Sequence, residues 1–202
     1  MSADSALADF LRDLRRLDRT RNRMEKLFGD RRITLTDLHS VYEALFLRAV
    51  TSFEGFLESL FIAIMIGRKT YTGGRVGLRM TVQTKEALMK ILLQGDKYMN
   101  WIPYKNTEDR ANIYLKNGKP FSDLTSNSRG TITTITTIRN AIAHKSKHAM
   151  GEFDKKVIGN ANLLRGERRP AGYLRSQVRT NPTQNRFEVY AAELARIAAD
   201  LC

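Results

Sequence analysis

Hydrophobic residues recur every three or four positions along most of the chain, which is the pattern of amphipathic helices. Between Ser5 and Phe28 the repeat includes Leu7, Phe10 and Leu14, with charged residues of both signs between them. The pattern predicts a first helix over this stretch, and a turn that extends to about residue 34. These residues form an N-terminal helix and turn ahead of a core from 35 to 202.

A longer and more apolar stretch follows the first helix. Thr36 and Asp37 offer a capping site at its start, and Gly67 marks its end. Its uninterrupted apolar run, Leu60 to Gly67, is much shorter than the roughly 20 residues that a membrane-spanning helix needs. We therefore expect a central helix of a bundle and no association with a membrane. Three further helices are predicted over about 84–93, 108–116 and 187–201.

The threonine-rich stretch after Gly130 could pass for a strand, because threonine and isoleucine favour extended structure. Its isoleucines, however, recur at intervals of three and four, as in Ile135, Ile138 and Ile142, whereas a half-buried strand would alternate by two. The spacing predicts one helix from about Ser128 to Met150. The fold class expected from the whole pattern is an all-α, up-and-down helical bundle.

The segments between the predicted helices are basic. They comprise a glycine-rich loop after Gly67 and a loop-like stretch from 163 to 186, which holds five arginines between Arg165 and Arg179. The formal net charge of +13 and the pI near 10.1 favour a polyanionic partner such as nucleic acid.

The length and the cysteine content limit the architecture further. A chain of 202 residues is long enough for one well-packed domain, and we expect a single domain over 1–202. The one cysteine, Cys202, excludes an intrachain disulfide, and the charged N-terminus lacks the pattern of a secretory signal. Both features predict a cytoplasmic protein.

Arg139, Asn140 and His144 interrupt the isoleucine-rich helix where apolar residues would be expected. At about 100° per residue, Asn140 and His144 share nearly one face, and His148 continues it one turn later. Arg139 lies about 140° from His144, so one straight helix does not point both side chains at one spot. A cleft on the two-fold axis of a homodimer would bring both residues together.

The spacing of this arginine and histidine is not distinctive by itself, because Arg32 and His39 also fit it. Arg32, however, lies in a charged turn. The sequence "RNAIAH" resembles the signature of HEPN domains, which is an arginine, a polar residue, three variable residues and a histidine. The stretches "RAVTSFEGFLESL", "NWIPY", "NGKPFSDL" and "RPAGYLR" resemble the RiboL-PSP-HEPN branch in particular, over about residue 35 to the C-terminus.

This resemblance implies an all-α bundle that dimerises around the helix with the motif, and a metal-independent endoribonuclease without a cofactor. It assigns Arg139 and His144 as the catalytic pair, Asn140 as the polar residue beside them and Glu54 as a supporting acid. The role implied is prokaryotic defence or a toxin, with a regulatory or antitoxin protein as a candidate partner. Ser146 stands where some members have a tyrosine that a partner enzyme modifies, so that form of control has no support.

The chemistry is consistent with cleavage of RNA. A histidine can take the proton of the 2′-hydroxyl, and an arginine can stabilise charge on the phosphate. The expected products carry a 2′,3′-cyclic phosphate and a 5′-hydroxyl. Basic residues expected to bind the RNA backbone are Arg68, Lys69, Arg75, Arg79, Lys145, Lys147, Arg168, Arg169 and Arg175.

Several alternatives remain open from the sequence. Arg139 could pair with Glu54 or Glu58 while His144 is a satisfied core group, and Glu54 could pair with another helix. The aromatic residues Trp101, Tyr104 and Phe121 could stack on bases or pack under their loops. The protein could also be a non-catalytic RNA-binding or protein-interaction module, or a DNA-binding subunit.

Overall fold

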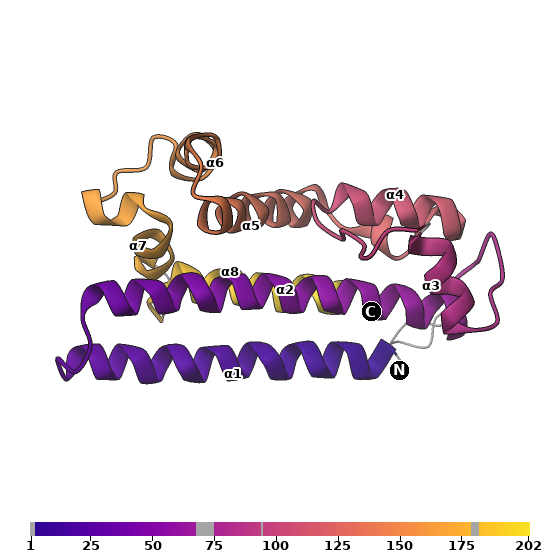
Figure 1. The fold of residues 1–202 in the computed structure, drawn as a ribbon, viewed down its shortest axis with the longest axis horizontal. Coiled ribbons are helices and arrows are strands. Elements are labelled where there is room, and N and C mark those ends of the chain that lie inside the picture. The colour runs from indigo at the N-terminus through magenta and orange to yellow at the C-terminus, as the bar shows by residue number, and fades with distance from the viewer. Residues whose placement is uncertain (1–2, 68–74, 94, 179–181) are drawn as a thin grey trace. The chain divides into compact units, whose positions relative to one another are not determined.

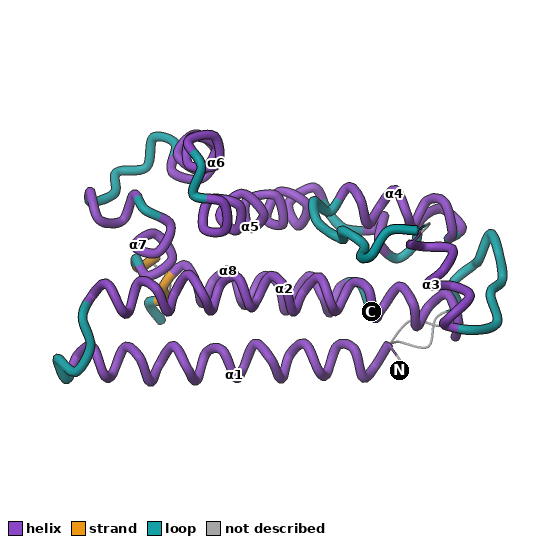
Figure 2. Tube along the Cα trace, viewed as in Figure 1, coloured by secondary structure: helices purple, strands orange, loops and turns teal. Residues whose placement is uncertain are grey.

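The computed structural model describes residues 3–67, 75–93, 95–178 and 182–202, and this part of the chain is mostly helical (Figures 1 and 2). The all-α fold class is therefore confirmed. The α-helices are α1 (Ala3–Gly29), α2 (Leu35–Gly67), α3 (Lys85–Leu93), α4 (Lys105–Tyr114), α5 (Ser126–His144), α6 (Lys147–Phe153), α7 (Pro170–Arg175) and α8 (Arg186–Asp200). Short helical turns are η1 (Lys116–Gly118), η2 (Phe121–Asp123), η3 (Asp154–Ile158) and η4 (Arg165–Arg168), and the short strands β1 (Gln177–Val178) and β2 (Gln184–Asn185) pair antiparallel.

The chain divides into two compact units. The first comprises Met1–Leu11, Ser52–Ile132 and Ala195–Cys202, and the second comprises Arg12–Thr51 and Thr133–Leu194. Helices α1, α2, α5 and α8 each contribute a segment to both units. The prediction of a single domain stays a prediction.

The first unit has an aromatic core centred on Phe61. Its ring lies 5.3 Å from that of Trp101 and 5.7 Å from that of Phe121, between ring centroids. Trp101 and Phe121 are buried, as is Tyr104, whose hydroxyl donates a hydrogen bond to the carbonyl of Phe121 at 2.8 Å. The three aromatic residues therefore pack under their loops, and stacking on bases would require this core to open.

The second unit has its own buried aromatic pairs. Tyr42 and Phe187 meet edge to face, with ring centroids 6.0 Å apart, and Phe153 and Tyr173 do so at 5.6 Å. These pairs join α2 to α8 and α6 to α7. Because each ring buries a large apolar area, these contacts are a main source of stability for the unit.

The start of α2 lies earlier than the sequence indicates. Thr34 caps the helix: its hydroxyl accepts a hydrogen bond from the amide of Asp37 at 3.2 Å, and the Asp37 carboxylate accepts one from the amide of Thr34 at 2.9 Å. This reciprocal pair is a capping box, in which Asp37 is the third helical residue and not the cap. The predicted cap at Thr36 and Asp37 is thus wrong by two positions.

The predicted helix from Ser128 to Met150 is two helices. Helix α5 ends at His144, Lys145 adopts a positive φ of 48°, and Ser146 caps α6 by accepting a hydrogen bond from the amide of Ala149 at 3.1 Å. The break falls on a lysine and a serine, so the spacing of the apolar residues did not reveal it. Serine is nevertheless a strong helix cap. His148 therefore lies on α6, and the prediction that it continues the face of Asn140 and His144 is wrong.

Helix α7 and the β1–β2 pair lie in the stretch from 163 to 186 that the sequence predicts to be a loop. Pro170 occupies the first turn of α7, a position that proline favours. A Cβ atom on Gly172 would lie 2.0 Å from the carbonyl oxygen of Gly166, so glycine is needed for α7 to pack against η4. The same glycine weakens a helical pattern in the sequence, which explains the wrong prediction.

Helix α2 is, by length and composition, apolar enough to cross a membrane, since one 18-residue window has a mean hydropathy of 1.6. The prediction from the sequence considered only its uninterrupted apolar run. Half of that window is buried inside the structure, and core helices of soluble proteins pass the same test. The expected absence of a membrane partner stays a prediction.

Candidate active site

The last two turns of α5 hold three of the four predicted catalytic residues. Arg139 and Asn140 are half-buried and His144, the last residue of the helix, is exposed. The neighbouring Ala141 and Ile142 are buried, which anchors this end of the helix in the second unit. The motif is therefore held on a fixed helix and its histidine is accessible to solvent.

A hydrogen bond turns the arginine toward the histidine face. Nη1 of Arg139 donates to Oδ1 of Asn140 at 3.1 Å. Asn140 lies only about 40° from His144 around the helix, so this bond directs the guanidinium around the helix surface. The length of the arginine side chain thus allows its guanidinium to reach part of the way across the 140° expected between Arg139 and His144.

The alternative in which His144 is a satisfied core group is wrong, because its side chain is exposed. The Glu58 carboxylate accepts a hydrogen bond from the indole nitrogen of Trp101 at 3.0 Å, within the first unit. Glu54 is half-buried on α2 and also belongs to the first unit. Its role as a supporting acid stays a prediction.

The predicted RNA-binding residues differ in how they are held. Arg68 and Lys69 lie outside the described residues. Arg75, Arg79, Lys147, Arg168 and Arg169 are exposed, and Lys145 is exposed with its ammonium 3.4 Å from the Glu43 carboxylate. Exposed pairs of this kind contribute little to stability and leave the cation accessible.

Arg175 is the exception among these basic residues. Its guanidinium donates two hydrogen bonds to the Glu25 carboxylate, at 2.9 and 3.2 Å, and lies 4.9 Å from the centroid of the Phe28 ring. Two of its nitrogens are thus already used, in a geometry that stacks the cation on an aromatic ring. The contacts favour a structural role for Arg175.

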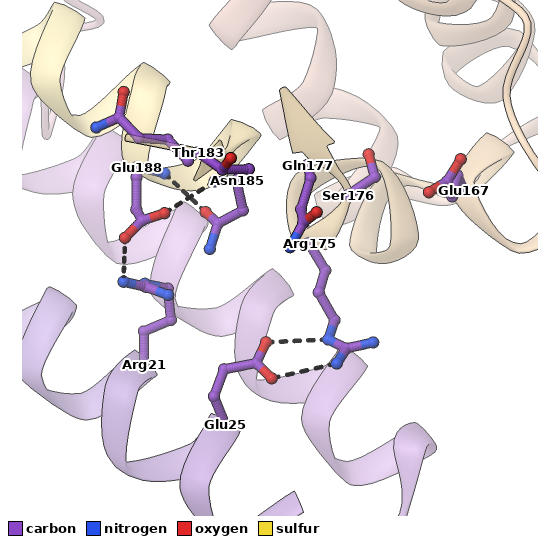
Figure 3. Close-up of a pocket in the computed structure, with 10 residues that line it drawn as sticks. Arg21, Glu25, Glu167, Arg175, Ser176, Gln177, Thr183, Asn185 and Glu188 are labelled. Atoms are coloured by element: carbon purple, nitrogen blue, oxygen red, sulfur yellow. Dashed lines mark hydrogen bonds and ion pairs between the residues drawn. The ribbon is translucent and has the colours of Figure 1, made fainter. Parts of the chain in front are cut away.

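A polar pocket of about 530 Å³ surrounds this ion pair in the second unit, and its only local sign in the sequence is Arg21, a charged residue on the apolar face of α1 (Figure 3). Its walls come from α1, η4, the end of α7, the β1–β2 pair and the start of α8. The residues that line it are Arg21, Glu25, Glu167, Arg175, Ser176, Gln177, Thr183, Gln184, Asn185 and Glu188.

The charged side chains at the base of the pocket form a continuous network. Arg21 contacts the Asp18 carboxylate at 2.8 Å and the Glu188 carboxylate at 2.5 Å, as Figure 3 shows for Glu188. Glu188 and Asn185 form a capping box at the start of α8, with hydrogen bonds of 2.8 and 2.9 Å. These contacts tie α1 to the first turn of α8.

Tyr42 links the Glu25–Arg175 pair to the capping box of Asn185 and Glu188. Its hydroxyl accepts a hydrogen bond from the Asn185 side chain at 3.3 Å and donates one to Glu25 at 2.7 Å. Burial, and then the Glu25 carboxylate, raise the pKa of the Tyr42 phenol above its usual value. Because each arginine is paired with carboxylates within the protein, the arrangement is suited to holding α1, α2, α7 and α8 together.

The Glu25 carboxylate gives the stability of the protein a dependence on pH. Burial raises its pKa, but the hydrogen bonds from Arg175 and Tyr42 outweigh burial and hold the pKa below the usual 4.5. Since the unfolded state then binds the proton more readily, this contribution is present above pH 4.5 and is lost as pH falls through the lower pKa of the folded state.

We expect Glu25→Gln to be less stable than the wild type at neutral pH, by an amount that shrinks as the pH falls below 4.5. Urea denaturation of both proteins over a series of pH values measures this difference. A difference that stays constant into the acid range would contradict the assignment. Tyr42→Phe, which removes only one of the hydrogen bonds to Glu25, should show a smaller effect of the same sign.

Within the described ranges, no group of three or more histidine, cysteine, aspartate or glutamate side chains is placed to hold a metal ion. Comparisons of the chain with protein-family models, with curated proteins and with solved structures found no match. The likeness to HEPN domains therefore depends on the sequence motifs alone.

Proposed function

We propose that the protein is a metal-independent endoribonuclease of the HEPN type, built as an up-and-down bundle that dimerises around α5. One observation carries the proposal: an exposed His144 ends a helix on which Asn140, one turn earlier, holds the Arg139 guanidinium by a hydrogen bond. The net charge of +13 supports a polyanionic substrate.

The proposed reaction is an attack of the 2′-hydroxyl on the adjacent phosphate. His144 takes the proton of the hydroxyl, because a histidine near neutral pH can act as a base or as an acid. Arg139 stabilises the negative charge on the phosphate oxygens with its planar set of donors. The bond from phosphorus to the 5′-oxygen then breaks, which leaves a 2′,3′-cyclic phosphate and a 5′-hydroxyl.

The homodimer supplies what one helix lacks. Protonation of the leaving 5′-oxygen needs an acid while the first histidine acts as a base, and two copies of α5 on a two-fold axis would contribute His144 twice. The same arrangement brings an Arg139 of each copy to one cleft.

The proposal is tested by incubating labelled RNA with the protein in excess EDTA and identifying the ends of the products. We expect cleavage with cyclic-phosphate ends and no cleavage of an RNA with a 2′-deoxy substitution at the cut site, because the nucleophile is then missing. Loss of cleavage in EDTA, or 3′-hydroxyl products, would contradict the proposed mechanism.

The exposed cations of the second unit support one other function. Arg168 and Arg169, on and directly after η4, and Lys147 on α6 would bind RNA in a non-catalytic module as well. In that case the same assay returns intact RNA at protein concentrations at which the RNA is bound. We propose a regulatory or antitoxin partner and a role in prokaryotic defence for the nuclease, and not for the non-catalytic module.

A further inference from the structure

Helix α1 carries a row of cations along the face opposite its buried side. Arg12, Arg16, Arg19, Arg23 and Lys26 are all exposed. At about 100° per residue they fall within an arc of about 80°, and at 1.5 Å per residue they extend over about 21 Å. We call these five residues the α1 stripe, and all of them belong to the second unit.

The opposite face of α1 is buried. Phe10, Leu14, Leu17 and Arg21 lie about 140° to 200° from Arg12 around the helix, and each is at most 9% exposed. The apolar face therefore fixes the orientation of the helix, and the stripe is held toward solvent.

The cations of the stripe are mostly unmatched by acids. Among the residues that the structure describes, no carboxylate forms an ion pair with Arg16, Arg19, Arg23 or Lys26. The nearby Asp18 carboxylate instead contacts Arg21 at 2.8 Å. A row of like charges at three- and four-residue spacing repels itself, and a polyanion bound along the row would relieve that repulsion.

The composition of the stripe fits phosphates of a nucleic acid better than a membrane. Four of its five members are arginines, whose planar donors bind phosphate oxygens in pairs. A helix that binds a membrane surface inserts an exposed apolar face among the lipids, but Leu14 and Leu17 are buried within this protein.

We infer that the α1 stripe binds the phosphate backbone of RNA and acts as a docking surface outside the candidate active site. The choice of RNA as the ligand rests on the proposed function. Because contacts to the backbone do not read sequence, the stripe adds affinity for any RNA without adding a sequence preference. The stripe and Arg139 lie on different helices, so binding and cleavage can be altered separately.

The test is the binding of a fluorescein-labelled RNA hairpin, followed by anisotropy over a series of salt concentrations. The stripe variant Arg16→Gln/Arg19→Gln/Arg23→Gln preserves helix propensity, since glutamine and arginine are nearly equal in helices. The matched control Lys85→Gln/Lys90→Gln/Lys97→Gln removes the same charge from exposed lysines of the first unit. All proteins carry His144→Ala, so that the RNA stays intact, and circular dichroism confirms that each is folded.

We expect the stripe variant to bind RNA more weakly at every salt concentration. The slope of log K against log salt should fall by about 3, because each phosphate that the protein no longer neutralises lowers the slope by about 1. The control should retain the slope of the parent protein. Equal slopes in both variants, or a weakening confined to binding of vesicles containing phosphatidylserine, would overturn the inference.

Cleavage is measured separately in proteins that retain His144. If the stripe variant binds RNA weakly and no protein cuts RNA, the docking surface stands and the nuclease proposal fails. If the wild type cuts RNA and the stripe variant binds it as well as the control does, the nuclease stands and the docking surface fails.

Discussion

Replacing His144 with alanine is expected to lower the rate of RNA cleavage by about 10²- to 10⁴-fold, which is the contribution typical of a general acid or base. Arg139→Ala should lower it by about 10²- to 10³-fold, as the removal of one charge-stabilising donor does. Single-turnover cleavage of a labelled RNA measures both rates. The melting temperature of His144→Ala should match the wild type, because the side chain is exposed.

His148→Ala is the matched control for this experiment. His148 is exposed like His144, but it lies on α6, beyond the break between the two helices. Its replacement should leave the cleavage rate near that of the wild type. An equal decrease of the cleavage rate in both variants would contradict the specific role of His144 as the catalytic base. An unchanged rate in His144→Ala would also contradict it.

Arg21→Met is expected to lower the free energy of unfolding by about 3 kcal/mol, the lower end of the range for breaking a buried ion pair. The Arg21 side chain is only 7% exposed and pairs with Asp18 and Glu188. Methionine fills much of the same volume but leaves both carboxylates without their cation. We expect the lower end of the range for this loss of stability because the Asp18 and Glu188 carboxylates are partly exposed to water.

Arg23→Met provides the control for the stability measurement. It makes the same chemical change two residues later, on the exposed face of α1. Surface substitutions of this kind usually change stability by less than about 0.5 kcal/mol. Urea denaturation of the two variants should therefore separate them clearly, and equal stabilities would show that the network around Arg21 does not hold the unit together.

The long helices could be predicted from the sequence because their buried apolar residues recur every three or four positions. The isoleucines of α5 identified a helix despite its threonines, and Ile135 and Ile138 are indeed buried. The short elements could not be predicted in this way. Helix α7 depends on the close approach of Gly172 to the carbonyl of Gly166 in the preceding turn η4, a contact that the spacing of apolar residues does not report.

The candidate site, like the fold, could be predicted from the sequence only in part. The motif placed Arg139, Asn140 and His144 on one helix, which is confirmed, but the bond from Arg139 to Asn140 depends on side-chain conformation. The pairs of the polar network could not be predicted, since residues such as Glu25 and Arg175 are 150 positions apart in the sequence. A charged residue such as Arg21 on an apolar face was its only local signal.

The break at Lys145 and Ser146 has a consequence for how the chain can change in length. A residue inserted at this break falls between two helices, so it leaves the phase of α5 unchanged. A residue inserted between Arg139 and His144 would instead rotate the imidazole by about 100° relative to the guanidinium. Insertions or deletions directly after His144 therefore leave the spacing within the motif unchanged.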